Sequence, residues 1–209
     1  MGSSAYLIFI PHAVDASPAE IRLMHKILDG KQRNTFKMYG KTCTMHRLMA
    51  LYGRSQIKFS GITLQEEKGE MPELVKRCLD YVADIDRQQP DRYWALVNWY
   101  PEATDYISPH TDDESDVGVV NEQQGPAVAT FSFCQVPRTF RIERKENKRR
   151  WDIALPNGSC AIMTGHRFQQ DFTHEVRPLS KRQAKQAAYS NLSIGRLSVT
   201  VRANPAGDM

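Results

Sequence analysis

Apolar residues near the start of the chain recur every three or four positions in two stretches, and this spacing predicts two amphipathic helices. The first should begin after Ser17, because Pro18 suits the first helical position and Glu20 can complete a capping box. It should end at Gly30 and pack through Ile21, Met24 and Leu28. The second is predicted between 71 and 88, with an apolar stripe formed by Leu74, Val75, Cys78, Leu79, Val82 and Ile85. Both are expected to cover a core rather than to carry chemistry.

Elsewhere, short apolar runs and alternating segments bounded by turn residues predict β-strands. They lie at 6–11, 92–100, 129–133, 138–143, 160–165 and 196–202. The last segment alternates strictly, with Leu197, Val199 and Val201 on one face and with Arg196, Ser198, Thr200 and Arg202 on the other. Many short strands with Gly and Pro turns, after an opening pair of helices, predict a jelly roll. The basic segment 181–191 is expected to be a surface loop.

The polar face of the 196–202 strand indicates an anionic ligand. Two guanidinium groups on the inner face of a small barrel would be costly to bury unless an anion lay against them. A dicarboxylate suits this face, since arginine pairs with carboxylate through two parallel hydrogen bonds.

A second chemical signal is the pair His110 and Asp112, separated by one residue. An extended backbone alternates its side chains, so both should point to the same face and form half of a metal site. A divalent ion needs a further ligand, for which His174 is the best candidate. Two histidines and one carboxylate leave one face of an octahedral ion open, which suits non-haem Fe(II). The pair alone is a weak signal, because such matches arise by chance in polar loops.

Composition predicts a globular protein of one domain, 1–209, with 41% hydrophobic and 25% charged residues. No apolar run is long enough to cross a membrane. The cysteines are scattered without C-x-x-C pairing, at Cys43, Cys78, Cys134 and Cys160, which is typical of free thiols in a reducing compartment. We therefore expect an intracellular monomer, nuclear or cytoplasmic and not secreted.

The net charge of +4 is compatible with a polyanionic partner. Basic and aromatic residues alternate between 31 and 61, as in the run from Phe36 to Lys41, and a second basic cluster lies at 141–150. Aromatic rings offer stacking surfaces to bases and cations hold phosphates, so the interleaving favours a hairpin that faces nucleic acid. The alternative is an ordinary hairpin with a solvated charged face.

Taken together, the motifs resemble the AlkB family of Fe(II)- and 2-oxoglutarate-dependent dioxygenases. They occur in the family's order along the chain: Arg47, Tyr52-Gly53, Phe59-Ser60-Gly61, Asn98-x-Tyr100, His110-x-Asp112-Asp113-Glu114, Ala129 to Phe133, His174 and Arg196-x-x-x-Thr200-x-Arg202. The resemblance implies an α+β fold, with a double-stranded β-helix (jelly-roll) core at about 92–202 behind N-terminal helices. It also implies a nucleotide-recognition lid at about 31–61.

The resemblance further implies Fe(II), 2-oxoglutarate and O2 as cofactors, and it assigns roles to individual residues. The metal ligands would be His110, Asp112 and His174. The 2-oxoglutarate residues would be Asn98, Tyr100, Arg196, Ser198 and Arg202, with Arg202 also close to the metal. Substrate would meet Phe59, Tyr39, Arg47, Asp113 and Glu114.

Some of these substrate roles have a physical rationale. A flipped base would stack between Phe59 and His110, and the acidic pair Asp113 and Glu114 would contact a cationic alkylated base. Tyr39, at the tip of its hairpin, matches the finger that enters the base stack and slightly favours duplex DNA over RNA.

Three positions depart from the family pattern. Ser198 stands where many relatives have Asn, and Cys134 and Ala103 each stand where relatives have Gly. These changes bear on substrate fit more than on metal binding, because none of the three is a predicted metal ligand.

The implied activity is oxidative demethylation of 1-methyladenine and 3-methylcytosine in DNA, with RNA left open, as direct reversal of alkylation damage. One alternative is a 2-oxoglutarate-dependent hydroxylase of a protein or small molecule, which the basic and aromatic segment argues against. Another is a silent nucleic-acid-binding module, which the full set of predicted metal and 2-oxoglutarate residues argues against.

Overall fold

The computed structural model describes residues 4–38, 40–112, 127–165 and 167–204. The helices in this part are α1 (Pro18–Asp29), α2 (Glu73–Asp86), α3 (Phe168–Asp171) and α4 (Lys181–Tyr189), with a 3-10 turn η1 (Pro90–Arg92). The strands are β1 (Tyr6–Ile10), β2 (Thr35–Met38), β3 (Lys41–Thr44), β4 (Leu48–Tyr52), β5 (Gln56–Phe59), β6 (Ile62–Gln65), β7 (Tyr93–Tyr100), β8 (Ile107–His110), β9 (Val128–Cys134), β10 (Arg138–Arg144), β11 (Arg150–Leu155), β12 (Ser159–Thr164), β13 (Phe172–Val176) and β14 (Arg196–Ala203). None of these helices has the length and apolar character needed to cross a membrane.

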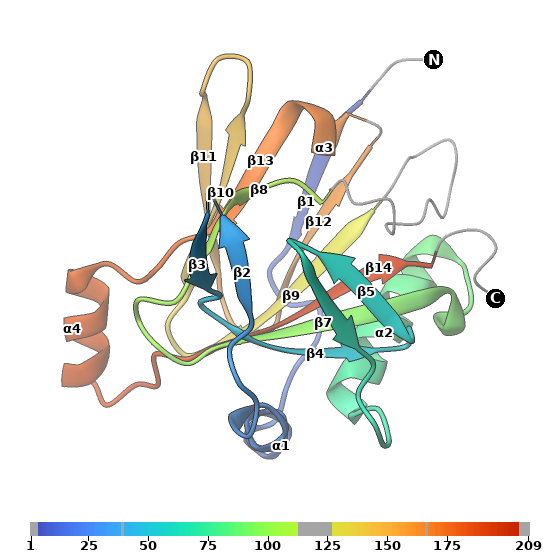
Figure 1. Cartoon of the computed structure of the whole chain (residues 1–209), viewed down its shortest axis with the longest axis horizontal. Helices are drawn as coiled ribbons and strands as arrows, with labels where there is room; N and C mark the ends of the chain where they lie inside the picture. The colour runs from blue at the N-terminus through green and yellow to red at the C-terminus, as the bar shows by residue number, and fades with distance from the viewer. Residues whose placement is uncertain (1–3, 39, 113–126, 166, 205–209) are drawn as a thin grey trace.

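Most of the described strands belong to two antiparallel sheets that form a jelly roll (Figure 1). One sheet has the strand order β1-β12-β9-β14-β7-β4, and the other has the order β11-β10-β13-β8. Two separate hairpins, β2-β3 and β5-β6, complete the described strands. The predicted α+β class with a jelly-roll core is confirmed. Strands β1 and β4 join the larger sheet from outside the range 92–202, and β4 lies within the range expected for the lid.

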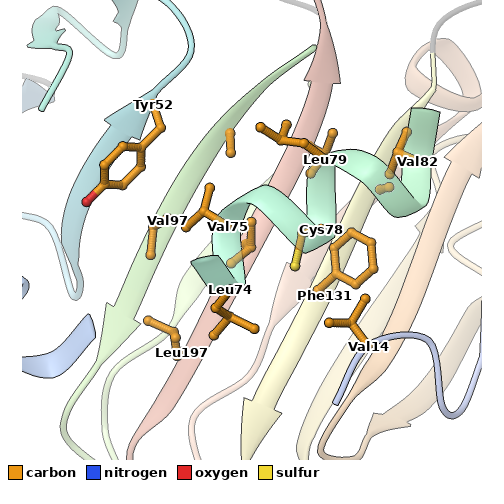
Figure 2. Packing of buried hydrophobic residues seen from close by; sticks show 14 of the residues in the cluster. Val14, Tyr52, Leu74, Val75, Cys78, Leu79, Val82, Val97, Phe131 and Leu197 are labelled. Carbon is orange, nitrogen blue, oxygen red and sulfur yellow. The ribbon is translucent and has the colours of Figure 1, made fainter. Parts of the chain in front are cut away.

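Helix α2 covers one face of the larger sheet (Figure 2). Its buried residues Leu74, Val75, Cys78 and Leu79 belong to the same core cluster as Val97 of β7, Phe131 of β9 and Leu197 of β14. Because strand side chains alternate between faces, the neighbours of these apolar residues point to the opposite side of the sheet. Packing under α2 therefore fixes which face of β14 carries its polar residues.

Helix α1 is capped as the sequence predicts. Ser17 is the N-cap, and its hydroxyl and the Glu20 carboxylate form both halves of a capping box. Glu20 also accepts a hydrogen bond of 2.6 Å from Arg77 of α2, so the cap ties the two helices together. Gly30 is the C-cap residue, with ordinary right-handed backbone angles.

Two predictions about the helices are wrong. Segment 181–191 is not a loop, since α4 occupies most of it and begins with a capping box between Ser180 and Gln183. This local start signal, followed by Ala, Lys and Gln, favours a helix although the segment is strongly polar. Ile85 has the spacing of the buried stripe of α2 but is 51% exposed. The periodicity of a helix sets the direction in which a side chain points, but it does not determine whether the packed core extends far enough to cover that side chain.

Candidate metal and co-substrate site

A pocket of about 750 Å³ lies against the polar face of β14. Its lining includes ten residues that the sequence assigned to the site: Arg47, Phe59, Asn98, Tyr100, His110, Asp112, His174, Arg196, Ser198 and Arg202. These side chains come from both sheets, from hairpin β5-β6 and from the segments that follow β3 and β8, so distant parts of the sequence meet in one cavity. The other assigned residues, Tyr39, Asp113 and Glu114, lie outside the described residues.

The three expected metal ligands meet at one end of this pocket. One potential ligand atom from each of His110, Asp112 and His174 lies within 4.8 Å of the others. The strand register explains part of the proximity, because His174 of β13 is paired directly with His110 of β8. Asp112 follows β8, and its backbone N–H donates a 2.9 Å hydrogen bond to the Gln169 side chain of α3. Sequence reasoning missed Gln169, since no motif marks it.

Local contacts keep the imidazole of His110 neutral, with a free lone pair for a divalent metal. His110 Nδ1 lies 2.8 Å from the Ser108 carbonyl oxygen, which favours a proton on Nδ1 and leaves Nε2 as the free lone pair. Burial and the neighbouring His174 lower the pKa of His110 to about 3, so its imidazole is neutral at physiological pH. Neutral imidazole is the form that binds metal.

Asp112 supplies the negative charge. Burial raises the pKa of its carboxyl group, but Arg202 and His174 outweigh burial and hold the pKa well below its ordinary value. Arg202 donates a hydrogen bond to this carboxylate, and its guanidinium carbon lies 5.3 Å from the centre of the Trp94 ring. The carboxylate is therefore ionised and oriented. Two imidazole nitrogens and one carboxylate oxygen fit Fe(II) with open coordination positions.

At the other end of the pocket, the buried guanidinium group of Arg196 can bind an anion. Arg196 is 1% exposed, and its Nε donates a 2.9 Å hydrogen bond to the hydroxyl of Ser132 on β9. Its Nη1 and Nη2 have no hydrogen-bond partner among the described residues, although both are buried. The ring of Tyr100 lies 5.3 Å from the guanidinium carbon. A buried fork of unpaired N–H donors fits the carboxylate of 2-oxoglutarate. Sequence reasoning gave Ser132 no role of its own, because its pairing with Ser198 exists only once β9 and β14 lie side by side.

The hairpins β2-β3 and β5-β6 contribute the outer lining of the pocket. Phe59 ends β5, and the segment after β3 provides His46 and Arg47. The His46 ring stacks on Tyr106, in the segment between β7 and β8, with ring centres 4.5 Å apart. Arg33, just before β2, binds Asp105 through two hydrogen bonds of 2.6 and 2.9 Å. These contacts fix the first hairpin to the core beside the pocket.

Comparison with known proteins agrees with this geometry. Residues 12–202 match the family model of the 2OG-Fe(II) oxygenase superfamily. The chain therefore belongs to the 2OG-Fe(II) oxygenase superfamily, and the family implies the cofactors Fe(II), 2-oxoglutarate and O2 that the donor sets fit.

Within this superfamily the predicted resemblance to the AlkB family is confirmed. The chain is 24% identical over 175 residues to the DNA oxidative demethylase ALKBH2 of Arabidopsis thaliana. That alignment covers 71% of this chain, and the chain spans about half, 53%, of the length of this curated relative.

Two solved structures share the fold. The structure of OsALKBH1 matches with a TM-score of 0.55 and 15% identity, covering 94% of this chain and 97% of that one. A prolyl hydroxylase of Trichoplax adhaerens, solved with a peptide fragment of the hypoxia inducible factor, matches with a TM-score of 0.60 and 12% identity, covering 97% of this chain and 84% of that one. At these identities the two matches support the jelly-roll fold.

Proposed function

We propose that the protein is an oxidative demethylase of N-alkylated bases, 1-methyladenine and 3-methylcytosine, in nucleic acid, with DNA favoured over RNA. The observation that carries the proposal is the composition of one pocket: the metal triad, the Arg196 fork and Phe59 of hairpin β5-β6 all line it. A planar base that enters it can lie against an aromatic ring while its methyl group approaches the metal. The name of the Arabidopsis relative, a DNA oxidative demethylase, supports the same substrate class.

The charge of the hairpins supports a nucleic-acid partner. Lys37 and Lys41 on β2-β3 and Lys58 on β5 are exposed. None of the three makes an ion pair with another described residue, so their ammonium groups are available to phosphates. Phosphate contacts position a strand without reading its sequence, which suits an enzyme that selects a damaged base by its pocket. We therefore propose that the hairpins in 31–61 act as the nucleotide-recognition lid.

The chain's own residues bind and orient the reactants. His110, Asp112 and His174 would hold Fe(II), and Arg196 with Tyr100 and Asn98 would hold the far carboxylate of 2-oxoglutarate. Bound together, Fe(II), 2-oxoglutarate and O2 supply the oxidant that hydroxylates an N-methyl group, whose hydroxymethyl product then releases formaldehyde. Arg202 keeps the Asp112 carboxylate ionised and directed at the metal position. Binding of the base would also exclude water from this end of the pocket.

The remaining substrate residues are proposed from the resemblance. Tyr39, which comes between β2 and β3 in the sequence, would act as the finger that enters the base stack, and Asp113 and Glu114 would contact the cationic base. A carboxylate beside a positively charged methylated ring gives selectivity over the neutral parent base.

The direct test is mass spectrometry of oligonucleotides that carry 1-methyladenine or 3-methylcytosine, as single- and double-stranded DNA and RNA. Each is incubated with the protein, Fe(II), 2-oxoglutarate and ascorbate, with His110→Ala as the matched inactive control. Loss of the methyl group that requires both Fe(II) and 2-oxoglutarate supports the proposal and ranks the four substrates. Succinate formation with no demethylation of any oligonucleotide would contradict it and direct the search to protein or small-molecule substrates.

A further inference from the structure

Arg138, the first residue of β10, is buried yet forms no part of the pocket lining. It is 1% exposed, and its guanidinium group donates only to backbone carbonyls in the described part of the chain. Nη1 binds the carbonyl oxygens of Ala103 and Asp105 at 2.9 and 3.2 Å. Nη2 binds those of Glu102 and Ile194 at 2.7 and 3.1 Å. A buried arginine with this set of partners holds two backbone segments together.

Both segments lead directly to the co-substrate end of the pocket. The turn that contains Glu102 and Asp105 follows Tyr100 at the end of β7, and Ile194 stands two residues before Arg196 at the start of β14. Tyr100 and Arg196 are themselves register partners on the two strands. Arg138 thus bridges the end of one strand and the start of the other, beside the pair of side chains that would receive the far carboxylate.

The approach to β14 is tightly packed at the same point. A side chain at Gly195 would place its Cβ 2.0 Å from the Trp99 ring, so the backbone can lie here only without one. The hydrogen bonds from Arg138 to backbone carbonyls and the close contact at Gly195 together restrict the backbone position of the start of β14. The position of Arg196 is therefore set from outside the pocket.

Arg138 also brings a charge that no described carboxylate neutralises directly. The buried acid Asp105 acts on Arg138 through its charge, but its carboxylate already accepts hydrogen bonds from Nη1 and Nη2 of Arg33 and from the backbone N–H of Glu102. Burial and the positive charge of Arg196 lower the pKa of Arg138 to about 10, so it remains protonated at neutral pH. Arg196 lines the pocket, and Arg138 lies outside the lining but close enough for the two charges to act on each other. Two buried positive charges so arranged favour a ligand that carries negative charge at this end of the pocket.

We propose that Arg138 is a positioning residue for the co-substrate: it holds the ends of β7 and β14 at the Arg196 site and adds the second positive charge that makes this site select a dicarboxylate over a monocarboxylic 2-oxo acid. The inference concerns the co-substrate and does not depend on the proposed nucleic-acid substrate, so the two can fail separately.

The test compares Arg138→Lys with Arg138→Gln, because both lose the planar fork and only the first keeps the charge. Binding of 2-oxoglutarate and of 2-oxobutyrate, which lacks the far carboxylate, is measured by isothermal titration calorimetry on the Mn(II)-loaded full chain. We expect Arg138→Gln to weaken 2-oxoglutarate binding about tenfold, which corresponds to about 1.4 kcal/mol. We expect its affinity for 2-oxobutyrate to stay within about twofold, because that ligand has no charge at this end. Arg138→Lys should recover part of the lost affinity for 2-oxoglutarate.

Arg141→Gln is the matched control, since Arg141 lies on the same strand but pairs with Asp152 at the surface. It should bind both ligands as the unchanged protein does. Equal losses for 2-oxoglutarate and 2-oxobutyrate in Arg138→Gln would overturn the proposal, because general damage to the pocket would explain them. Equal affinities of the Lys and Gln variants for 2-oxoglutarate would also overturn it.

Discussion

Replacing Ser132 with alanine removes the acceptor that holds Arg196 Nε at 2.9 Å and leaves the rest of β9 unchanged. Ser132 is fully buried, so water cannot replace the hydroxyl without a rearrangement of the sheet. Leaving a buried charged donor without its partner costs about 2 kcal/mol. For a chain of this size we expect a fall of about 4–8 °C in the midpoint of thermal unfolding. We also expect a higher KM for 2-oxoglutarate with nearly unchanged kcat, because the lost orientation affects binding before the chemical step.

Thermal unfolding followed by circular dichroism and steady-state kinetics with varied 2-oxoglutarate would measure the two effects. Thr130→Val is the matched control, since Thr130 lies on the same strand and shares a 3.3 Å hydrogen bond with Thr200, another neutral hydroxyl. Its loss should cost about 1 kcal/mol and change the KM for 2-oxoglutarate less. A Ser132→Ala variant with the stability and KM of the unchanged protein would refute the view that Ser132 orients the Arg196 guanidinium group.

Three further predictions concern the metal, the base and the helix pair. His110→Ala should abolish 2-oxoglutarate turnover and weaken Mn(II) binding while the circular dichroism spectrum stays the same; full turnover would exclude the metal assignment. Phe59→Ala should lower kcat/KM for a methylated oligonucleotide about tenfold, through loss of base stacking worth about 1–3 kcal/mol, and leave the KM for 2-oxoglutarate unchanged. If the KM for 2-oxoglutarate also rose about tenfold, Phe59 would be a core residue that supports the whole pocket. The bonds from Arg77 and Ser17 lower the pKa of Glu20 from 4.5 to about 2, so its contribution to stability is complete above pH 4.5 and is lost as the pH falls to about 2. Glu20→Gln should therefore be less stable than the unchanged protein by about 1 kcal/mol at pH 7, a gap that closes on acidification, and a gap independent of pH would contradict this.

Much of the fold and of the candidate site could be predicted from the sequence because the signals are local. The two-residue period of 196–202 assigned opposite faces to Leu197 and Arg196, and the structure buries the first under α2 and places the second in the pocket. The spacing of His110 and Asp112 predicted a shared direction, and the three expected ligands do lie together. The start of α4 was also local, in the Ser180 capping box, but the polarity of the segment obscured it.

Other features depended on which distant strands meet. Ser132 faces Arg196 because β9 and β14 are neighbours in the larger sheet, and Gln169 reaches Asp112 because α3 precedes the strand that pairs with β8. Arg138 donates to the carbonyl oxygens of Glu102, 36 residues before it in the sequence, and of Ile194, 56 residues after it. Such contacts leave no periodicity in the sequence, since a backbone carbonyl can be offered by any residue.

The sequence by itself indicated the metal ligands and the anionic face, because side-chain chemistry and strand alternation depend only on residue type and spacing. The class of the protein followed from the resemblance of its motifs to a known family. The tertiary structure alone decided how that chemistry is held in place: which hydroxyl orients Arg196, which arginine clamps the strand ends, and which hairpins line the pocket. The physical reason is that burial and hydrogen-bond partners are properties of packing between segments far apart in the chain, and they exist only once the sheets have formed.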